Sequence, residues 1–163
     1  MKNIIIQPYG VVNKDDVVDL ILPFKKGEFG IPITLDMQPD LKEIPTFYQI
    51  NKGNFWVARI HNKIVGTIAL LDIGNNRGAL RKMFVAKEYR GKEFGIGQDL
   101  LTYLMGWAKQ NHIIEIFIGT IAKFIAAQRF YEKNGFIEVP KEELPKEFPV
   151  MDVDVKFYRI TTL

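Results

Sequence analysis

A cluster of glycines and basic residues in the middle of the chain has the composition of an anion-binding turn. The segment YRGKEFGIGQDLL, residues 89–101, directly follows an apolar run. Backbone N–H groups in such a turn, reinforced by the positive end of a following helix dipole, bind phosphate oxygens, and basic side chains at the rim neutralise their charge. The predicted phosphate-binding residues are Arg90, Gly91, Lys92, Gly95, Ile96, Gly97 and Gln98.

Two common phosphate-binding motifs do not fit this segment. The dinucleotide pattern G-x-G-x-x-G fails because Gly95 and Gly97 are followed by Leu100. The P-loop pattern fails because the residue five positions after Gly91 is Ile96, where a glycine is required. The upstream strands also form a meander, not repeated strand–helix–strand units. The cluster therefore belongs to another kind of phosphate site.

The periodicity of the apolar residues predicts the elements that position this turn. A three-stranded antiparallel meander at 54–60, 63–72 and 78–86 leads into the glycines, and a helix at 98–111 begins where they end. A strand rich in β-branched residues at 113–120 is expected to lie parallel to the strand before the glycines. Further strands are predicted at 3–8, 136–139 and 152–160, and helices at 15–24 (capped by Asn13 or Asp15), 41–50 and 122–134.

The composition indicates one globular domain spanning residues 1–163. Hydrophobic residues make up 47% of the chain and charged residues 25%, and there is no cysteine, which excludes disulfides and thiolate chemistry. The net charge of +3 comes from scattered lysines, so nucleic-acid binding is not favoured. Because no signal-peptide core or membrane-spanning run is evident, we expect a cytoplasmic protein without membrane contact.

The chain resembles the GCN5-related N-acetyltransferase (GNAT) family in two motifs and in the order of its elements. That family has a Q/R-x-x-G-x-G/A loop after its fourth strand, here within FVAKEYRGKEFGIGQDLL (84–101), and a last-helix segment similar to AAQRFYEKNGF (126–136). The resemblance implies an α/β (α+β) fold. Its mixed, mostly antiparallel central sheet would have about six to seven strands, helices on both faces and a splay between the fourth and fifth strands.

The resemblance also implies a reaction, in which acetyl-coenzyme A is the co-substrate and its acetyl group moves directly to an amine without a metal. Phe84 and Val85 match the strand positions whose backbone pairs with the pantetheine arm and whose N–H groups stabilise the oxyanion. Tyr131 matches the general acid that protonates the departing thiolate. The acceptor, a small-molecule or peptide amine, is not identified, and the oligomeric state stays open, with a homodimer among the candidates.

The loop departs from the family pattern in a way that leaves its register open. Counting back from Gly97 places the family's Q/R position at Lys92, whereas counting forward from Arg90 requires an insertion of Glu93 and Phe94. Both registers remain open at this point.

Two further departures concern polar contacts and the base. Phe124 stands where many members have an asparagine, and the fourth strand offers Arg81 and Lys82 where some members have a glutamate base. No base is assigned, so a catalytically silent acyl-coenzyme A binding or sensing module remains the alternative function.

Other residues with chemical potential are expected to have structural or surface roles. His61 is predicted in a hairpin turn and His112 just beyond a helix end, and both are expected to be exposed. The acidic residues of the early segment, where the family builds its acceptor site, are expected to be solvated: Glu28, Asp36 and Asp40. Four aromatic residues are expected mainly to pack in the core, with an acceptor pocket as the alternative: Phe29, Phe47, Tyr48 and Trp56.

Overall fold

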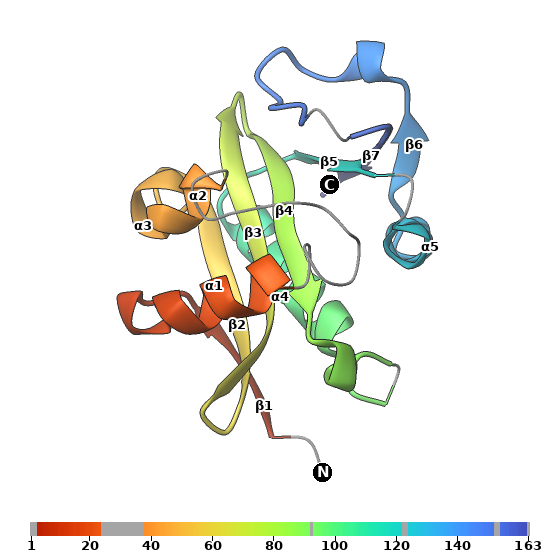
Figure 1. Ribbon diagram of the computed structural model, residues 1–163. Helices are drawn as coiled ribbons and strands as arrows, with labels where there is room; N and C mark the ends of the chain where they lie inside the picture. Colours follow the sequence, from red (N-terminus) through yellow and green to blue (C-terminus); the bar gives the residue numbers. More distant parts are fainter. Residues whose placement is uncertain (1–2, 24–37, 92, 122–123, 152–153, 163) are drawn as a thin grey trace.

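A seven-stranded mixed sheet forms the centre of the protein in the computed structural model (Figure 1), which describes residues 3–23, 38–91, 93–121, 124–151 and 154–162. The strand order is β1-β2-β3-β4-β5-β7-β6. Every neighbouring pair is antiparallel except β4 and β5, which are parallel. The expected mixed, mostly antiparallel sheet is therefore confirmed.

The predicted meander is present with nearly the predicted bounds. It consists of β2 (Asn54–Ile60), β3 (Lys63–Gly74) and β4 (Arg77–Val85). The turn between β2 and β3 places His61 at a positive φ of 54°, which a tight hairpin requires. The other strands are β1 (Ile4–Pro8), β5 (Glu115–Thr120), β6 (Ile137–Val139) and β7 (Lys156–Thr161).

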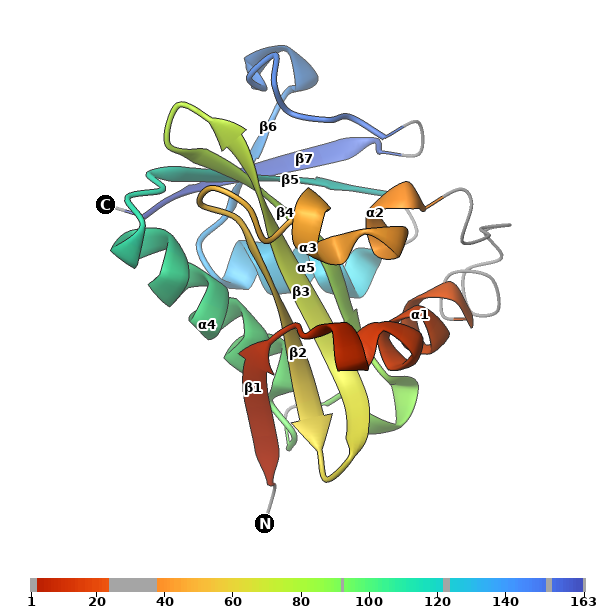
Figure 2. The same cartoon turned by 90° about the vertical axis from the view of Figure 1, so that its left-hand side faces the viewer.

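Helices cover both faces of the sheet, as expected (Figure 2). One face carries α1 (Lys14–Pro23), α2 (Pro39–Lys42) and α3 (Ile44–Phe47), and the other carries α4 (Ile96–Gln110) and α5 (Ile125–Lys133). Short 3₁₀ helices lie at Val11–Asn13, Lys87–Tyr89 and Lys141–Glu143. Within the described ranges, no helix has the length and apolar character needed to cross a membrane.

Two predictions for the first half of the chain are wrong. The single helix expected at 41–50 is two short helices, because Glu43 between them has non-helical backbone angles and Pro45 supplies no N–H to continue the first helix. Of the two residues predicted to cap α1, Asn13 instead uses its side-chain oxygen to accept the Gly10 N–H at 3.0 Å, which closes the preceding 3₁₀ turn, and Asp15 lies inside the first turn of the helix.

The alternation of side chains along the strands produces a core on each face of the sheet. In β2, Trp56 and Ala58 join the cluster that includes Leu100 and Leu104 of α4. The intervening residues of β2 belong to a second cluster on the other face, with residues of α1, α2 and α3. Both faces are thus buried by helices, as the period-two pattern of a sheet core requires.

The parallel strands β4 and β5 separate after three paired residues. The pairs are Arg77–Glu115, Gly78–Ile116 and Ala79–Phe117. Beyond them, β4 continues along β3 while β5 continues along β7, and the two strands run in clearly different directions in Figure 1. The predicted splay between the fourth and fifth strands is confirmed.

A β-bulge bends β4 within this diverging part. The register with β3 shifts between Thr67 and Ala69, so β4 carries one residue more than its partner. Lys82 lies in the bulge with a φ of 55°, a left-handed conformation that is uncommon outside glycine. The Thr67 hydroxyl donates to the Lys82 carbonyl at 2.7 Å and holds this backbone in place.

Candidate active site

The end of β4 presents a backbone N–H group to the gap between β4 and β5. Val85 lies opposite Gly66 of β3, and the Ala86 N–H donates to the Val65 carbonyl at 2.8 Å. In an antiparallel ladder this pattern marks Val85 and Gly66 as a pair without mutual hydrogen bonds, so the Val85 N–H and C=O point away from β3. Phe84 has the opposite orientation, with its carbonyl near Gly66. Of the two predicted oxyanion donors, Val85 is the one that faces the gap.

Arg90 ties the following loop to this strand end. Its Nε donates to the Val85 carbonyl at 2.9 Å, across the 3₁₀ turn at Lys87–Tyr89. Farther along the loop, the rings of Tyr89 and Phe94 pack edge to face, with 5.5 Å between centroids. Arg90 therefore holds the loop against the end of β4. The sequence predicted only that its charge would neutralise a phosphate at the rim of the turn. Lys92 lies outside the described residues.

The first turn of α4 points unsatisfied N–H groups out of the helix end. Gly95 is the N-cap, with a φ of 64° that glycine adopts without strain, and no side chain of the described residues caps it. The Asp99 N–H is bonded back to the Gly95 carbonyl at 3.0 Å. The N–H groups of Ile96, Gly97 and Gln98 precede that bond and have no intrahelical acceptor, as at every helix start. Together with the dipole they form an anion site.

Gly97 brings this turn close to β4 and α5. A Cβ at Gly97 would lie 3.3 Å from the Met83 Cε and 4.0 Å from the nearest ring carbons of Phe130. Any larger residue would push the Met83 side chain aside. The glycine thus permits close packing where the loop, the strand and the last helix meet.

Tyr131 of α5 reaches the same meeting point from the opposite side. Its side chain is 6% exposed and packs against the rings of Phe130, Phe136 and Tyr158. Its hydroxyl donates to the Met83 Sδ at 3.7 Å. Burial raises the pKa of Tyr131 above the usual tyrosine range, so the hydroxyl keeps its proton at neutral pH. A proton donor therefore faces a sulfur atom at this point.

A buried ion pair lies beneath the bulge on the α2 and α3 face. Lys82 Nζ is 3.2 Å from Asp40 Oδ2 and also donates to the Gln38 side-chain oxygen, while the Tyr48 hydroxyl donates to Asp40 Oδ2 at 2.5 Å. Burial alone would raise the pKa of Asp40, but the Lys82 ammonium, the Tyr48 hydroxyl and the Arg81 guanidinium together hold it below its usual value.

The expectation that Asp40 is solvated is therefore wrong. Its carboxylate is buried because the Lys82 ammonium and the Tyr48 hydroxyl replace water around it. A carboxylate with a lowered pKa and two partners is a weak base. One signal for this cluster is visible in the sequence: a lysine at a strand position, with apolar residues on both sides of the R-K pair.

The aromatic and histidine residues named from the sequence, where the structure describes them, lie in the environments that were predicted. Tyr48 and Trp56 are buried and Phe47 is half-buried, which confirms core packing for these three. His61 and His112 are exposed, as predicted. Three named residues lie outside the described ranges: Glu28, Phe29 and Asp36. The described residues contain no group of His, Asp or Glu side chains arranged to hold a metal ion.

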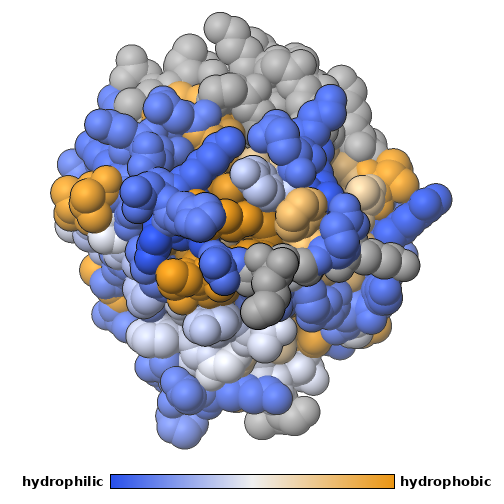
Figure 3. Space-filling model, turned by 90° about the horizontal axis from the view of Figure 1, so that it is seen from below, coloured by the Kyte–Doolittle hydropathy of each residue, from blue (hydrophilic) through white to orange (hydrophobic). Residues whose placement is uncertain are grey.

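The surface near the loop is hollowed. The lower face of the molecule, which carries the loop between β4 and α4, has hydrophobic residues in a central hollow and hydrophilic residues around it (Figure 3).

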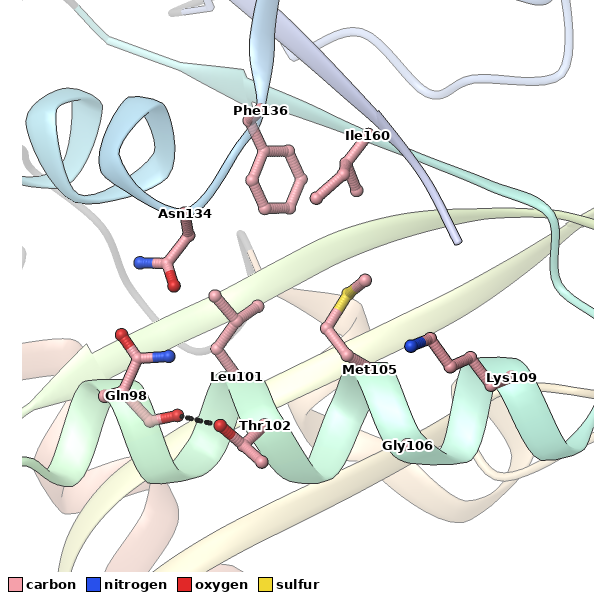
Figure 4. A pocket seen from close by; sticks show the side chains of 9 residues that line it. All are labelled: Gln98, Leu101, Thr102, Met105, Gly106, Lys109, Asn134, Phe136 and Ile160. Carbon is pink, nitrogen blue, oxygen red and sulfur yellow. Dashed lines mark hydrogen bonds between the residues drawn. The ribbon is translucent and has the colours of Figure 1, made fainter. Parts of the chain in front are cut away.

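A second hollow, of about 300 Å³, lies along α4, opposite the turn between α5 and β6 (Figure 4). Its floor is apolar and its rim polar; the lining residues are Leu101, Met105, Gly106, Phe136, Ile160, Gln98, Thr102, Lys109 and Asn134. Gln98 belongs both to this rim and to the first turn of α4.

Comparison with known proteins identifies the family. Residues 51–138 match the model of the acetyltransferase (GNAT) domain. The structure of an acetyltransferase of the GNAT family from Staphylococcus aureus MU50 is 42% identical, with a TM-score of 0.93, and the match covers 98% of this chain and 99% of that one.

Two curated relatives match over shorter segments. The N-acetylaspartate synthetase of Xenopus tropicalis is 38% identical over 107 residues, 63% of this chain and 38% of that protein. Streptothricin acetyltransferase A of Bacillus subtilis is 35% identical over 114 residues, 70% of this chain and 64% of that protein. This chain thus spans less than two thirds of either relative's length. The family match and the shared sheet with its splayed strands confirm the expected resemblance: the chain belongs to the GNAT acetyltransferase family.

Proposed function

We propose that this protein, acting as one domain over residues 1–163, transfers the acetyl group of acetyl-coenzyme A directly to the amino group of a small acceptor. The observation that carries this proposal is the N–H of Val85, which points away from β3 into the gap between β4 and β5, on the strand that leads through the loop to the open N-terminus of α4. The thioester carbonyl and the diphosphate of one cofactor need these two kinds of donor, one at each end of the pantetheine arm between them.

The cofactor would lie along the free edge of β4. Its diphosphate would accept hydrogen bonds from the N–H groups of Ile96, Gly97 and Gln98. The loop that Arg90 fixes to the strand would complete the phosphate site with Gly91, Lys92 and Gly95. The Phe84–Val85 stretch would pair with the pantetheine arm, and the Val85 N–H would donate to the thioester oxygen. A fixed donor at this oxygen stabilises the negative charge that develops during attack.

The chemical step would be a direct displacement. The neutral amine attacks the thioester carbon and forms the C–N bond, the C–S bond breaks, and the thiolate takes the proton of the Tyr131 hydroxyl. The proton lost by the amine would leave to solvent, and Tyr131 would regain a proton from solvent, so that the net products are the amide and the free thiol. Tyr131 suits this role because burial keeps it protonated and because its hydroxyl already donates to a sulfur, that of Met83.

The relatives support a small acceptor without identifying it. The names of two of them refer to N-acetylaspartate and streptothricin, and neither protein is matched over its whole length. An amino acid or another small amine is therefore the class that we propose.

One observation favours the alternative, a catalytically silent acyl-coenzyme A binding module. Among the described residues β4 carries no carboxylate, and Asp40 is held by Lys82 with a lowered pKa. A module without a base would bind the cofactor but not turn it over.

Release of free coenzyme A from acetyl-coenzyme A, with and without a panel of amines, distinguishes the two functions. We expect amine-dependent release that falls by about 100-fold or more in Tyr131→Phe. Tyr103→Phe, which alters an exposed tyrosine of α4, is the control and should behave as wild type. A thermal shift with acetyl-coenzyme A but no amine-dependent release would support the silent module.

A further inference from the structure

Arg81 lies at the mouth of the opening between β4 and β5. It is the second residue of β4 after the last pair with β5, and it lies opposite Ala69 of β3. Because opposed residues share a face of the sheet, Arg81 points to the same side as Ala69, whose cluster includes Leu41 and Tyr48. Its side chain therefore belongs to the α2 and α3 face, opposite the face that carries Tyr131.

The guanidinium reaches across the opening to the segment that covers β5. Its Nη2 donates to the Met151 Sδ at 3.6 Å. The Met151 N–H in turn donates to the Asp154 carboxylate at 3.0 Å, and this carboxylate lies against β5, 2.5 Å from where a Cβ of Gly119 would stand. Arg81 thus spans from one diverging strand to the chain that lies on the other.

Arg81 forms no ion pair with a carboxylate among the described residues. Met151 supplies a weak, neutral acceptor, and Asp40, whose pKa the Arg81 charge helps to lower, is bonded to Lys82 and Tyr48 instead. The nearby carboxylates are already held, Asp40 by Lys82 and Tyr48, and Asp154 by the Met151 N–H. A half-buried guanidinium in this setting offers its planar donors to an anion.

We propose, on the basis of the acetyl transfer proposed above, that Arg81 binds a carboxylate of the acceptor, so that the substrate class is an amine that carries a carboxylate. A guanidinium binds a carboxylate through two parallel hydrogen bonds, which fixes orientation as well as charge. Since a strand rises about 3.3 Å per residue, Arg81 and Val85 are on the order of 13 Å apart along β4. The carboxylate therefore lies several bonds from the attacking nitrogen.

A matched pair of acceptors tests this proposal. In 6-aminohexanoate and 6-aminohexanamide the carboxyl group is too remote to change the amine's basicity, so a difference in kcat/KM reports recognition of the charge. We expect wild type to prefer the carboxylate by about 10- to 100-fold, as for a hydrogen-bonded charged pair. Arg81→Gln should reduce that preference to near one, through a higher KM for the acceptor. Arg59→Gln, which alters a β2 arginine that donates to the His61 carbonyl, should keep the preference.

The outcomes separate this proposal from the proposed function. If wild type acetylates both compounds equally well, acceptor recognition by Arg81 is wrong while acetyl transfer stands, and this result needs no variant. If no amine increases coenzyme A release, the acetyl transfer itself is wrong. An unchanged thermal shift of Arg81→Gln with acetyl-coenzyme A shows that the variant is folded, and a preserved preference in that folded variant overturns the assignment.

Discussion

The Tyr131 hydroxyl donates to the Met83 sulfur at 3.7 Å, across the gap between α5 and β4. Because a thioether is a neutral, weak acceptor, this contact does not oppose the effect of burial, which raises the pKa of Tyr131. The same hydroxyl is the proton donor in the proposed reaction. The environment of the Tyr131 hydroxyl therefore predicts how kcat should depend on pH.

The pH profile of kcat should show no alkaline decline caused by Tyr131 below about pH 10, the ordinary tyrosine value. The acid works only when protonated, and a raised pKa keeps it protonated over a wider range toward high pH. The check is kcat of wild type and Tyr131→Phe between about pH 6 and 10. A falling limb near neutral pH that disappears in Tyr131→Phe would contradict this assignment.

Arg90→Gln should weaken acetyl-coenzyme A binding by about 5- to 10-fold, the size of one lost hydrogen bond at a partly exposed site. The reason is loss of the 2.9 Å bond from Arg90 Nε to the Val85 carbonyl, which fixes the loop to β4. Calorimetric titration measures the affinity. Arg90→Lys retains the charge without this fork of donors, so binding as tight as wild type in that variant would show that charge alone matters.

Gly97→Ala should lower acetyl-coenzyme A affinity by about 10-fold or more, since the new Cβ would stand 3.3 Å from the Met83 Cε at the open helix end. Gly106→Ala is the matched control, because it lies in the same helix with nothing within 4 Å of the added atom. It should instead raise stability by about 0.5–1 kcal/mol. Equal affinities in the two variants would argue against a cofactor at the first turn of α4.

Lys82→Met should lower the free energy of unfolding by about 3–5 kcal/mol, because it leaves the Asp40 carboxylate buried without its ammonium. The double variant Lys82→Met with Asp40→Asn should recover part of that loss, since the remaining charge is also removed. Urea unfolding at neutral pH provides the values. A double variant less stable than Lys82→Met alone would mean that the pair is not the source of the effect.

The same ion pair predicts an acid dependence of stability. Asp40 has a pKa below its unfolded value, so its contribution is complete above the unfolded value of about 3.9 and is lost as the pH falls through the lower folded value. The stability difference between wild type and Asp40→Asn should therefore shrink below about pH 4. An unchanged difference in urea unfolding at that pH would show that Asp40 does not titrate there.

Local patterns predicted the elements whose causes are local. The β2–β3 hairpin follows from alternating apolar residues around a tight turn, and α4, predicted from Gln98, begins slightly earlier, at Ile96 after the left-handed Gly95. The split between α2 and α3 could have been read from Pro45, which removes the N–H that a continuous helix needs.

The contacts that the sequence did not reveal join distant segments. Lys82 meets Gln38 across 44 residues and the nearby Asp40 as well, and Arg81 meets Met151 across 70 residues. Neither pair has a local pattern, because both depend on how α2 and the segment before β7 pack over the bulge in β4. The orientation of the backbone at the end of β4 could not be predicted from the sequence either. Only the ladder register shows that Val85, and not Phe84, turns its N–H to the gap.

A crystal structure with a non-hydrolysable acetyl-coenzyme A analogue tests the central claim most directly. The account predicts the acyl oxygen about 3 Å from the Val85 nitrogen, the diphosphate on the N–H groups of Ile96, Gly97 and Gln98, and the Tyr131 hydroxyl beside the atom that replaces sulfur. An analogue bound elsewhere, with the Tyr131 hydroxyl still donating to the Met83 sulfur, would contradict it.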